Sequence, residues 1–229
     1  MLIKGFQKTT LLDFPQKIAC TVFTGGCNFR CPFCHNASLV THISSDHTID
    51  PEEILSYVTK RKGILDGVCI TGGEPTLQPD LADFCREIHA RGLLVKLDTN
   101  GAFPEKLAPL MEQGLIDYIA MDIKNSKEEY ARTCGLTEFP QGVEESIRMI
   151  MSSGIPYEFR TTAVREFHTV ESIRSLAQWI SGAEQYFLQA FTDSGDLIGE
   201  GLSAFSENEM RDLLSAAIPF LPNAKLRGI

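Results

Sequence analysis

Three cysteines stand close together in the stretch TGGCNFRCPFCHN at residues 24–36. Cys27, Cys31 and Cys34 follow a Cys-x3-Cys-x2-Cys spacing, and a short loop of this kind can wrap three thiolates around one inorganic centre. A structural zinc site takes four protein ligands, and so does each [4Fe–4S] cluster of the ordinary electron-transfer type. Three clustered cysteines therefore predict either a fourth ligand elsewhere in the chain or a metal position kept open for a substrate.

A zinc site is the alternative interpretation of this stretch. His42 and His47 follow the cysteines closely enough to complete a four-ligand zinc site, whereas His35 is adjacent to Cys34 and the pair could bind one ion only awkwardly. We favour the cluster, because an open iron gives the three-ligand spacing a use in catalysis.

The other four cysteines have an ordinary structural interpretation. Cys20 and Cys69 lie in apolar strands and Cys85 lies on the apolar face of a helix, so all three are expected to be buried as small hydrophobic residues. Cys134 is expected to be a structural cysteine in a loop. An odd count of seven cysteines, with no secretion signal, argues against a disulfide framework.

The composition indicates one soluble domain. The chain has 229 residues, of which 43% are hydrophobic and 22% charged, and its formal net charge is −9. An acidic chain of this size argues against nonspecific nucleic-acid binding, which needs clustered cations. No apolar run is long enough to span a bilayer, so no membrane partner is expected and the cytoplasm is the expected location.

Strand patterns alternate with helix patterns along the whole chain. Strands are expected at 18–26, 67–73, 93–101, 117–124, 157–164, 185–191 and 224–229, and helices at 50–62, 79–92, 104–114, 142–154, 169–182 and 206–218. Alternation of this kind predicts parallel strands joined by right-handed crossovers. Six units are too few for a closed eight-fold barrel, so we expect an α/β fold, a partial (β/α)6 barrel. A single domain spans 1–229, with 1–17 as a hairpin or edge strand and 18–229 as the partial barrel.

Polar residues follow the expected strands at the ends that should form one rim. TGGEP at 71–75, DTNG at 98–101, DIKN at 122–125 and FRTT at 159–162 all occupy such positions, and Gln189 lies in the sixth strand. In folds of this class the carboxyl ends of parallel strands and the loops after them build the site. We therefore expect these segments to meet the cysteine loop.

Two carboxylates and one arginine are the notable charges at this rim. Asp98 and Asp122 end neighbouring strands, and two facing carboxylates need a cation or ribose hydroxyls between them. Arg160 lies inside a strand, where an unpaired charge is costly, so it is expected to be functional or to pair with Asp122 or Glu74. His168 and Gln189 are weaker candidates.

The motifs resemble those of a known superfamily. CNFRCPFC resembles the signature of the radical S-adenosylmethionine (SAM) superfamily, and TGGEP resembles its GGE motif. CHN after the cysteines, DTNG and DIK are similar to the activating enzymes of glycyl-radical enzymes. The segment TTLLDFPQKIACTVFTGGCNFRCPFCHN most resembles those that activate anaerobic ribonucleoside-triphosphate reductase, although Gln16 stands where a glycine is expected.

This resemblance implies a fold, two cofactors and a reaction. The fold is a partial barrel of the radical SAM type, in which Cys27, Cys31 and Cys34 bind a single [4Fe–4S] cluster and act as its catalytic ligands. Residues 37–50 are too few for an inserted ferredoxin-like domain with further clusters. The implied SAM contacts are Phe33, Asn36, Gly72, Gly73, Glu74, Asp98, Thr99, Asp122, Lys124 and Arg160.

In the implied reaction, one electron cleaves SAM and the resulting 5′-deoxyadenosyl radical takes a hydrogen atom from the substrate. The implied substrate is a glycine of a partner glycyl-radical enzyme, with anaerobic ribonucleoside-triphosphate reductase favoured. Flavodoxin or ferredoxin is the implied electron donor. The alternative is a radical SAM enzyme that acts on a small molecule, as 7-carboxy-7-deazaguanine synthase does.

Overall fold

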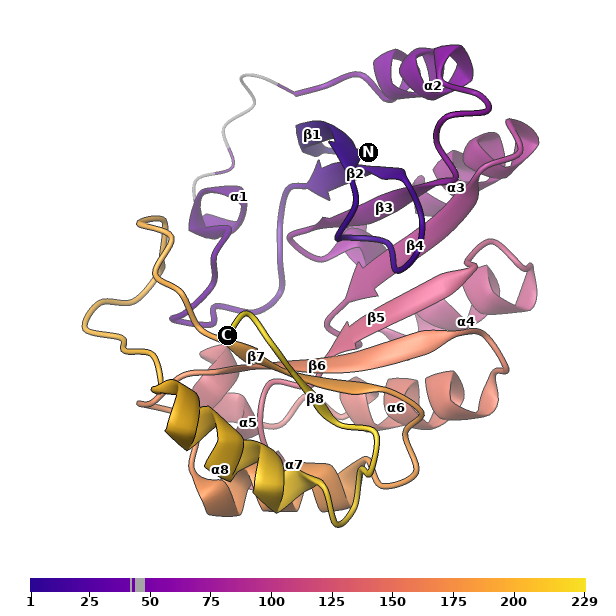
Figure 1. The fold of residues 1–229 in the computed structure, drawn as a ribbon. Coiled ribbons are helices and arrows are strands. Elements are labelled where there is room, and N and C mark those ends of the chain that lie inside the picture. Colours follow the sequence, from indigo (N-terminus) through magenta and orange to yellow (C-terminus); the bar gives the residue numbers. More distant parts are fainter. Residues whose placement is uncertain (42, 44–47) are drawn as a thin grey trace.

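The computed structural model describes residues 1–41, 43 and 48–229, and its centre is one eight-stranded sheet (Figure 1). The strands are β1 (Ile3–Thr10), β2 (Ala19–Thr24), β3 (Gly67–Gly72), β4 (Leu94–Thr99), β5 (Tyr118–Asp122), β6 (Tyr157–Ala163), β7 (Tyr186–Ala190) and β8 (Lys225–Arg227). They lie side by side in chain order. β1 pairs with β2 in antiparallel fashion, and every later pair is parallel.

Helices connect the parallel strands, and most of them lie along the outer side of the sheet, whereas α1 stands beside the loop after β2 (Figure 1). They are α1 (Ala37–Thr41), α2 (Pro51–Lys60), the 3-10 turn η1 (Pro75–Leu77), α3 (Leu81–Ala90), α4 (Pro104–Glu112), α5 (Lys127–Cys134), α6 (Gly142–Ser152), α7 (Val170–Trp179) and α8 (Glu207–Ala217). No helix in the described part of the chain has the length and apolar character needed to cross a membrane. The predicted helices are confirmed, whereas α1 and α5 were not expected.

The sheet is open. In the described residues β1 pairs only with β2 and β8 only with β7, so the two ends of the sheet do not join. This arrangement confirms the expected partial barrel of parallel strands. It also brings the carboxyl ends of β2 to β7 to one rim, where the loops after the strands can meet.

The two faces of the sheet have different chemistry because side chains alternate along each strand. Residues on the outer face pack under the helices and are fully buried, among them Val95, Leu97, Ile119, Met121 and Phe159. Lys96, Asp98, Glu158 and Arg160 occupy the alternate positions, and ion pairs join them inside the partial barrel. The apolar core therefore lies between sheet and helices, and the interior of the barrel is polar.

Local signals explain where the helices begin. The Asp50 side chain accepts a hydrogen bond from the backbone N–H of Glu52 at 3.0 Å, and Pro51 opens α2 as expected. Ser206 and Glu209 form the predicted capping box of α8. In the connection between β1 and β2, Gln16 has a φ of 60°, in the left-handed region that glycine tolerates best.

Candidate active site

A cavity of about 250 Å³ opens at the rim where the strands end. The residues around it include most of the predicted site: Cys27, Phe33, Cys31, Cys34, Asn36, Gly72, Gly73, Asp98, Thr99, Asp122, Lys124, Arg160 and Gln189. Its wall also contains His35, Thr71, Asn100 and Thr162, which the sequence did not single out as cofactor contacts. Glu74 is the one predicted SAM contact that does not line this cavity.

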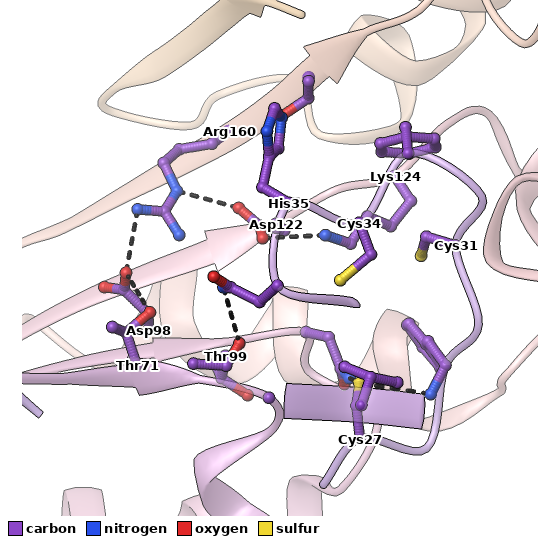
Figure 2. A pocket seen from close by; sticks show the side chains of 18 of the residues that line it. Cys27, Cys31, Cys34, His35, Thr71, Asp98, Thr99, Asp122, Lys124 and Arg160 are labelled. Carbon is purple, nitrogen blue, oxygen red and sulfur yellow. Dashed lines mark hydrogen bonds and ion pairs between the residues drawn. The ribbon is translucent and has the colours of Figure 1, made fainter. Parts of the chain in front are cut away.

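The three clustered cysteines are free thiols on one side of this cavity (Figure 2). Burial raises the pKa of Cys27 to about 11 and also raises the pKa of Cys34, while the nearby Lys124 ammonium opposes both effects. Buried thiols with raised pKa values become ligands when a metal displaces their protons. Three thiols around a cavity of this size fit a cluster of several iron atoms.

A single zinc ion fits the described residues less well. Within them, no three His, Cys, Asp or Glu side chains form a group that could hold one metal ion. His35 packs against the ring of Phe191, with ring centroids 5.6 Å apart. The predicted alternative ligands His42 and His47 lie outside the described residues.

Cys134 does not lie in a loop, which corrects the sequence prediction. It is the last residue of α5 and it is fully buried. Its backbone oxygen accepts a hydrogen bond from the N–H of Arg30 at 2.9 Å. The end of α5 therefore packs directly on the cysteine loop.

Gly72 and Gly73 bring the end of β3 into contact with that loop as well. A Cβ on Gly72 would lie 2.5 Å from the backbone nitrogen of Thr24, and a Cβ on Gly73 would lie 1.9 Å from the backbone oxygen of Gly26. Both glycines line the cavity, but the close approach that needs them is between two backbone segments of the chain itself. These backbone contacts alone require glycine at both positions, and the predicted contacts with SAM stay a prediction.

Glu74 lies beneath the cavity and cross-links two loops. Its carboxylate accepts hydrogen bonds from the backbone N–H and hydroxyl of Thr76, from the Thr99 hydroxyl and from the backbone N–H of Asn100, at 2.6 to 3.1 Å. Burial raises its pKa, and these donors oppose the rise. The side chain is fully buried, so in this structure it fixes the positions of Thr99 and Asn100, and its predicted contact with SAM stays a prediction.

Arg160 is the cation between the two aspartates (Figure 2). Its Nε donates to Asp122 Oδ1 at 2.9 Å and its Nη1 donates to Asp98 Oδ2 at 3.2 Å. Burial alone would raise the pKa of both carboxyls. Arg160 together with a lysine, Lys96 at Asp98 and Lys124 at Asp122, outweighs burial, so both pKa values lie below their ordinary value.

Two lysines complete this charged network. Lys124 Nζ lies 2.9 Å from Asp122 Oδ2 at the cavity wall. Lys96 pairs with Asp98 one step deeper in the barrel, and its Nζ lies 3.8 Å from the sulfur of Cys69, which therefore does not have purely apolar surroundings. Sequence reasoning missed Lys96, although a lysine two residues before Asp98 in an apolar strand is the signal that could have revealed it.

The remaining candidates divide between the cavity and the core. Phe33 lies in the cavity wall and packs against the ring of Phe167 at 5.7 Å between centroids. Asn36 donates to the backbone oxygen of Gly72 at 3.3 Å. His168 is buried and bonds to backbone atoms of Val164 and Lys124, so it is a satisfied core histidine.

Comparison with known proteins agrees with these motifs. A family model described as the radical SAM superfamily matches residues 21–180. A Methanocaldococcus jannaschii protein, provisionally named a glycyl-radical enzyme activating enzyme, is 31% identical over 235 residues, which cover 100% of this chain and 96% of the relative. The pyruvate formate-lyase-activating enzyme of Clostridium pasteurianum is 26% identical over 78% of this chain and 75% of its own length.

A relative with a small-molecule name matches less of the chain. The 7-carboxy-7-deazaguanine synthase of Methanopyrus kandleri is 29% identical over 43% of this chain and 46% of its own length.

Solved structures share the fold at low sequence identity. A domain of a pyruvate-formate lyase-activating enzyme from Bacteroides vulgatus gives a TM-score of 0.58 at 19% identity, over 71% of this chain and 99% of that domain. Streptococcus suis SuiB bound to its precursor peptide SuiA gives 0.71 at 12% identity, over 91% of this chain and 48% of SuiB.

Proposed function

Because the chain belongs to the radical SAM superfamily, we propose that it is an activase that takes a hydrogen atom from a glycine of a partner glycyl-radical enzyme. Enzymes of this superfamily use a [4Fe–4S] cluster and SAM, so these are the cofactors of this chain. The observation that carries the proposal is the match to an activating-enzyme relative along the whole length of both chains.

The residues at the cavity fit the two cofactors. Cys27, Cys31 and Cys34 would hold three of the four irons, and one iron would stay free of protein ligands. When bound, the cluster and SAM supply reductive bond cleavage and a species able to abstract hydrogen. The protein must hold SAM in one orientation and keep water away from the reacting atoms.

The charged rim supports the binding of a zwitterionic ligand such as SAM. Lys124 lies at the cavity wall and forms an ion pair with Asp122, and Arg160 holds Asp98 and Asp122 in place through ion pairs to both. We assign Lys124 to the carboxylate of SAM. Arg160, Asp98 and Asp122 would form the polar wall, because their mutual ion pairs already occupy much of their hydrogen-bonding capacity.

Other cavity residues would contact the rest of SAM. Asn36, Gly72, Gly73 and Thr99 would offer hydrogen-bonding groups and close backbone approach. Phe33 would pack near the adenine. Glu74 would act from below by fixing Thr99 and Asn100.

For the partner, we propose anaerobic ribonucleoside-triphosphate reductase, on the resemblance of the segment that leads into the cysteine loop. The gap between β1 and β8 fits a protein substrate, since a loop carrying the target glycine could approach the rim from the open side. We propose a flavodoxin or a ferredoxin as the electron donor.

The test is anaerobic reconstitution followed by incubation with SAM, a reductant and the candidate reductase. The expected result is a glycyl-radical signal in electron paramagnetic resonance, together with 5′-deoxyadenosine in proportion to it. A reductase whose target glycine is replaced by alanine serves as the control and should give no signal. Replacing the chemical reductant with reduced flavodoxin or with reduced ferredoxin then identifies the electron donor.

The second candidate function is a reaction on a small molecule, which the partial match to a 7-carboxy-7-deazaguanine synthase favours. Conversion of a carboxylated pterin without any partner protein would refute the activase proposal. A radical on pyruvate formate-lyase but not on the reductase would keep the activase function and refute the choice of partner.

A further inference from the structure

We propose that Gln189, with Thr162 beside it, binds the peptide backbone of the partner segment that carries the target glycine. This role rests on the proposed activase function and goes beyond it, because it assigns two side chains of the chain to the protein substrate. Both residues line the cavity at the strand ends. Neither belongs to the cysteine loop or to the network of ion pairs.

Most hydrogen-bonding side chains of the cavity wall are already engaged within the protein. Asp98, Asp122, Lys124 and Arg160 share the ion pairs described above. The other engaged side chains bond to neighbouring residues: Thr71 to Asp98 at 3.1 Å, Asn36 to the backbone oxygen of Gly72 at 3.3 Å, Thr99 to Glu74 at 2.8 Å, and Asn100 to Asn28 at 2.8 Å. Their capacity to bind a ligand is therefore partly used by the protein itself.

Thr162 and Gln189 differ from these groups. Within the described residues, the Thr162 hydroxyl and the Gln189 side-chain amide form no hydrogen bond with the protein, although both residues are only partly exposed. His35 shares this property, but its ring packs against Phe191. A polar group in a cavity wall that no protein group satisfies keeps its donors and acceptors available to a ligand.

The sheet places the two side chains next to each other. Thr162 in β6 and Gln189 in β7 are partners in the parallel register, and neighbouring strands lie about 4.8 Å apart. They follow Arg160 and Phe187 by two residues, so they lie on the same face of the sheet as that pair. On its other side Gln189 is in register with Arg227 of β8, the last strand. The two unengaged side chains therefore lie on the part of the wall near the open end of the sheet, where the partner's loop would enter.

A peptide backbone is the ligand that fits this pair. A primary amide carries donors and an acceptor, so it can pair with both the N–H and the C=O groups of a peptide segment, and a hydroxyl can pair with either. Both side chains are uncharged, whereas the carboxylate of SAM is best matched by a cation such as Lys124.

The size of the cavity favours the same ligand. Sites for small molecules usually measure about 300–1,000 Å³, so a cavity of about 250 Å³ leaves little space beside SAM. A glycine segment needs the least space, because glycine has no side chain. The competing interpretation is that Thr162 and Gln189 contact the uncharged parts of SAM, its ribose or its adenine.

The test compares Gln189→Leu and Thr162→Val with the unsubstituted protein after anaerobic reconstitution. Both substitutions keep the approximate size of the side chain and remove its hydrogen bonds. The probe is a synthetic peptide that spans the target glycine of the candidate reductase, titrated with SAM present and without reductant, so that no turnover occurs. The dissociation constant of the peptide should rise about tenfold in Gln189→Leu and about threefold in Thr162→Val. The affinity for SAM, measured without peptide, should equal that of the unsubstituted protein.

Activation of the complete reductase provides a second measurement. The KM for the reductase should rise in both variants, with a smaller change in kcat, because the lost contacts serve binding of the substrate. Gln178→Leu is the matched control, since Gln178 is an exposed residue of α7 outside the cavity. This variant should bind the peptide as the unsubstituted protein does.

Unchanged peptide affinity in both variants, at full iron content, would overturn the inference. A SAM affinity that falls as much as the peptide affinity, or more, would assign the pair to SAM and overturn it as well. If Gln189→Leu does not fold, Thr162→Val decides by the same comparison, and if the isolated peptide is not bound, the KM for the reductase decides. An unsubstituted protein that neither binds the peptide nor forms a radical on the reductase would instead refute the proposed function itself.

Discussion

Replacing Gly73 with alanine tests why the end of β3 needs a glycine. The new Cβ would lie 1.9 Å from the backbone oxygen of Gly26, and nonbonded carbon contacts are favourable only at about 3.5 Å or more. The two segments would have to separate by roughly 1.5 Å. That movement would break the hydrogen bonds from Gly73 N to Thr24 O at 2.8 Å and from Glu74 N to Gly26 O at 2.7 Å.

The magnitude follows from these contacts. Overpacking of a tight site costs about 1–3 kcal/mol, and each lost backbone hydrogen bond costs about 1 kcal/mol. We therefore expect Gly73→Ala to lower the free energy of unfolding by about 3–5 kcal/mol, a large fraction of the stability of a typical domain. The effect should appear in the cluster-free protein, because the clash is between parts of the chain itself.

Anaerobic urea unfolding, followed by the fluorescence of the single tryptophan Trp179, measures this loss. Gly114→Ala is the matched control: Gly114 has a φ of +63°, but a Cβ there would meet nothing within 4 Å. The control should cost about 1 kcal/mol from backbone strain alone and should bind iron normally. A Gly73→Ala protein within about 1 kcal/mol of the unsubstituted chain and with full iron content would refute the close-approach argument. Space for a bound ligand would then be the remaining reason for a glycine at this position.

Three further predictions concern the charged network, Glu74 and Gln16. Arg160→Gln should lower the free energy of unfolding by about 2–3 kcal/mol at pH 7, below the usual cost of breaking a buried pair because Asp98 and Asp122 each keep a lysine. The pKa values of both aspartates are depressed in the folded protein, so the stability that they contribute is present above about pH 4 and is lost as the pH falls through the folded pKa. Urea unfolding across pH should therefore show that the difference in unfolding free energy between Arg160→Gln and the unsubstituted protein shrinks on acidification. A difference that stays constant with pH would contradict this. Glu74→Gln should destabilise the cluster-free protein by about 2 kcal/mol, because an amide nitrogen would face the backbone N–H of Asn100. An unchanged free energy of unfolding together with weaker SAM binding would instead indicate direct contact between Glu74 and SAM. Gln16→Gly should raise the free energy of unfolding by up to about 1 kcal/mol in the same assay, because glycine removes the strain of a left-handed backbone conformation. A loss of stability would show that the Gln16 side chain contributes more than the strain costs.

The convergence of the strand ends was predictable because it depends only on topology. Parallel strands place their carboxyl ends at one edge, so Asp98, Asp122 and Arg160 could be expected to meet from their positions in the sequence. Their close ion pairs could not be predicted from topology alone, since the sequence left both a cation and ribose hydroxyls as possible partners of the carboxylates. The register of β5 and β6, which pairs Asp122 with Arg160, selects the cation.

Helix α5 was not predicted because it has little apolar periodicity. Of its eight residues only Tyr130, Thr133 and Cys134 are buried, and the rest are mostly charged. The sequence signals for this helix lie at its two ends. Ser126 occupies the N-cap position, acidic residues fill the first turn, and Gly135 follows in the left-handed conformation. Attention to these ends would have placed Cys134 on a helix, although its backbone contact with Arg30 in the cysteine loop depends on tertiary packing that no local pattern reports.

The cysteine loop shows why its spacing alone could not explain the site. Three connections that lie far apart in the sequence hold the loop by backbone hydrogen bonds: Glu74 N donates to Gly26 O, Arg30 N donates to Cys134 O, and Gly199 N donates to Pro32 O, at 2.7 to 2.9 Å. These bonds form when the barrel folds, so the conformational entropy of the loop is lost in folding and not when the cofactors bind. A short motif can supply the three thiols, but the completed fold must orient them.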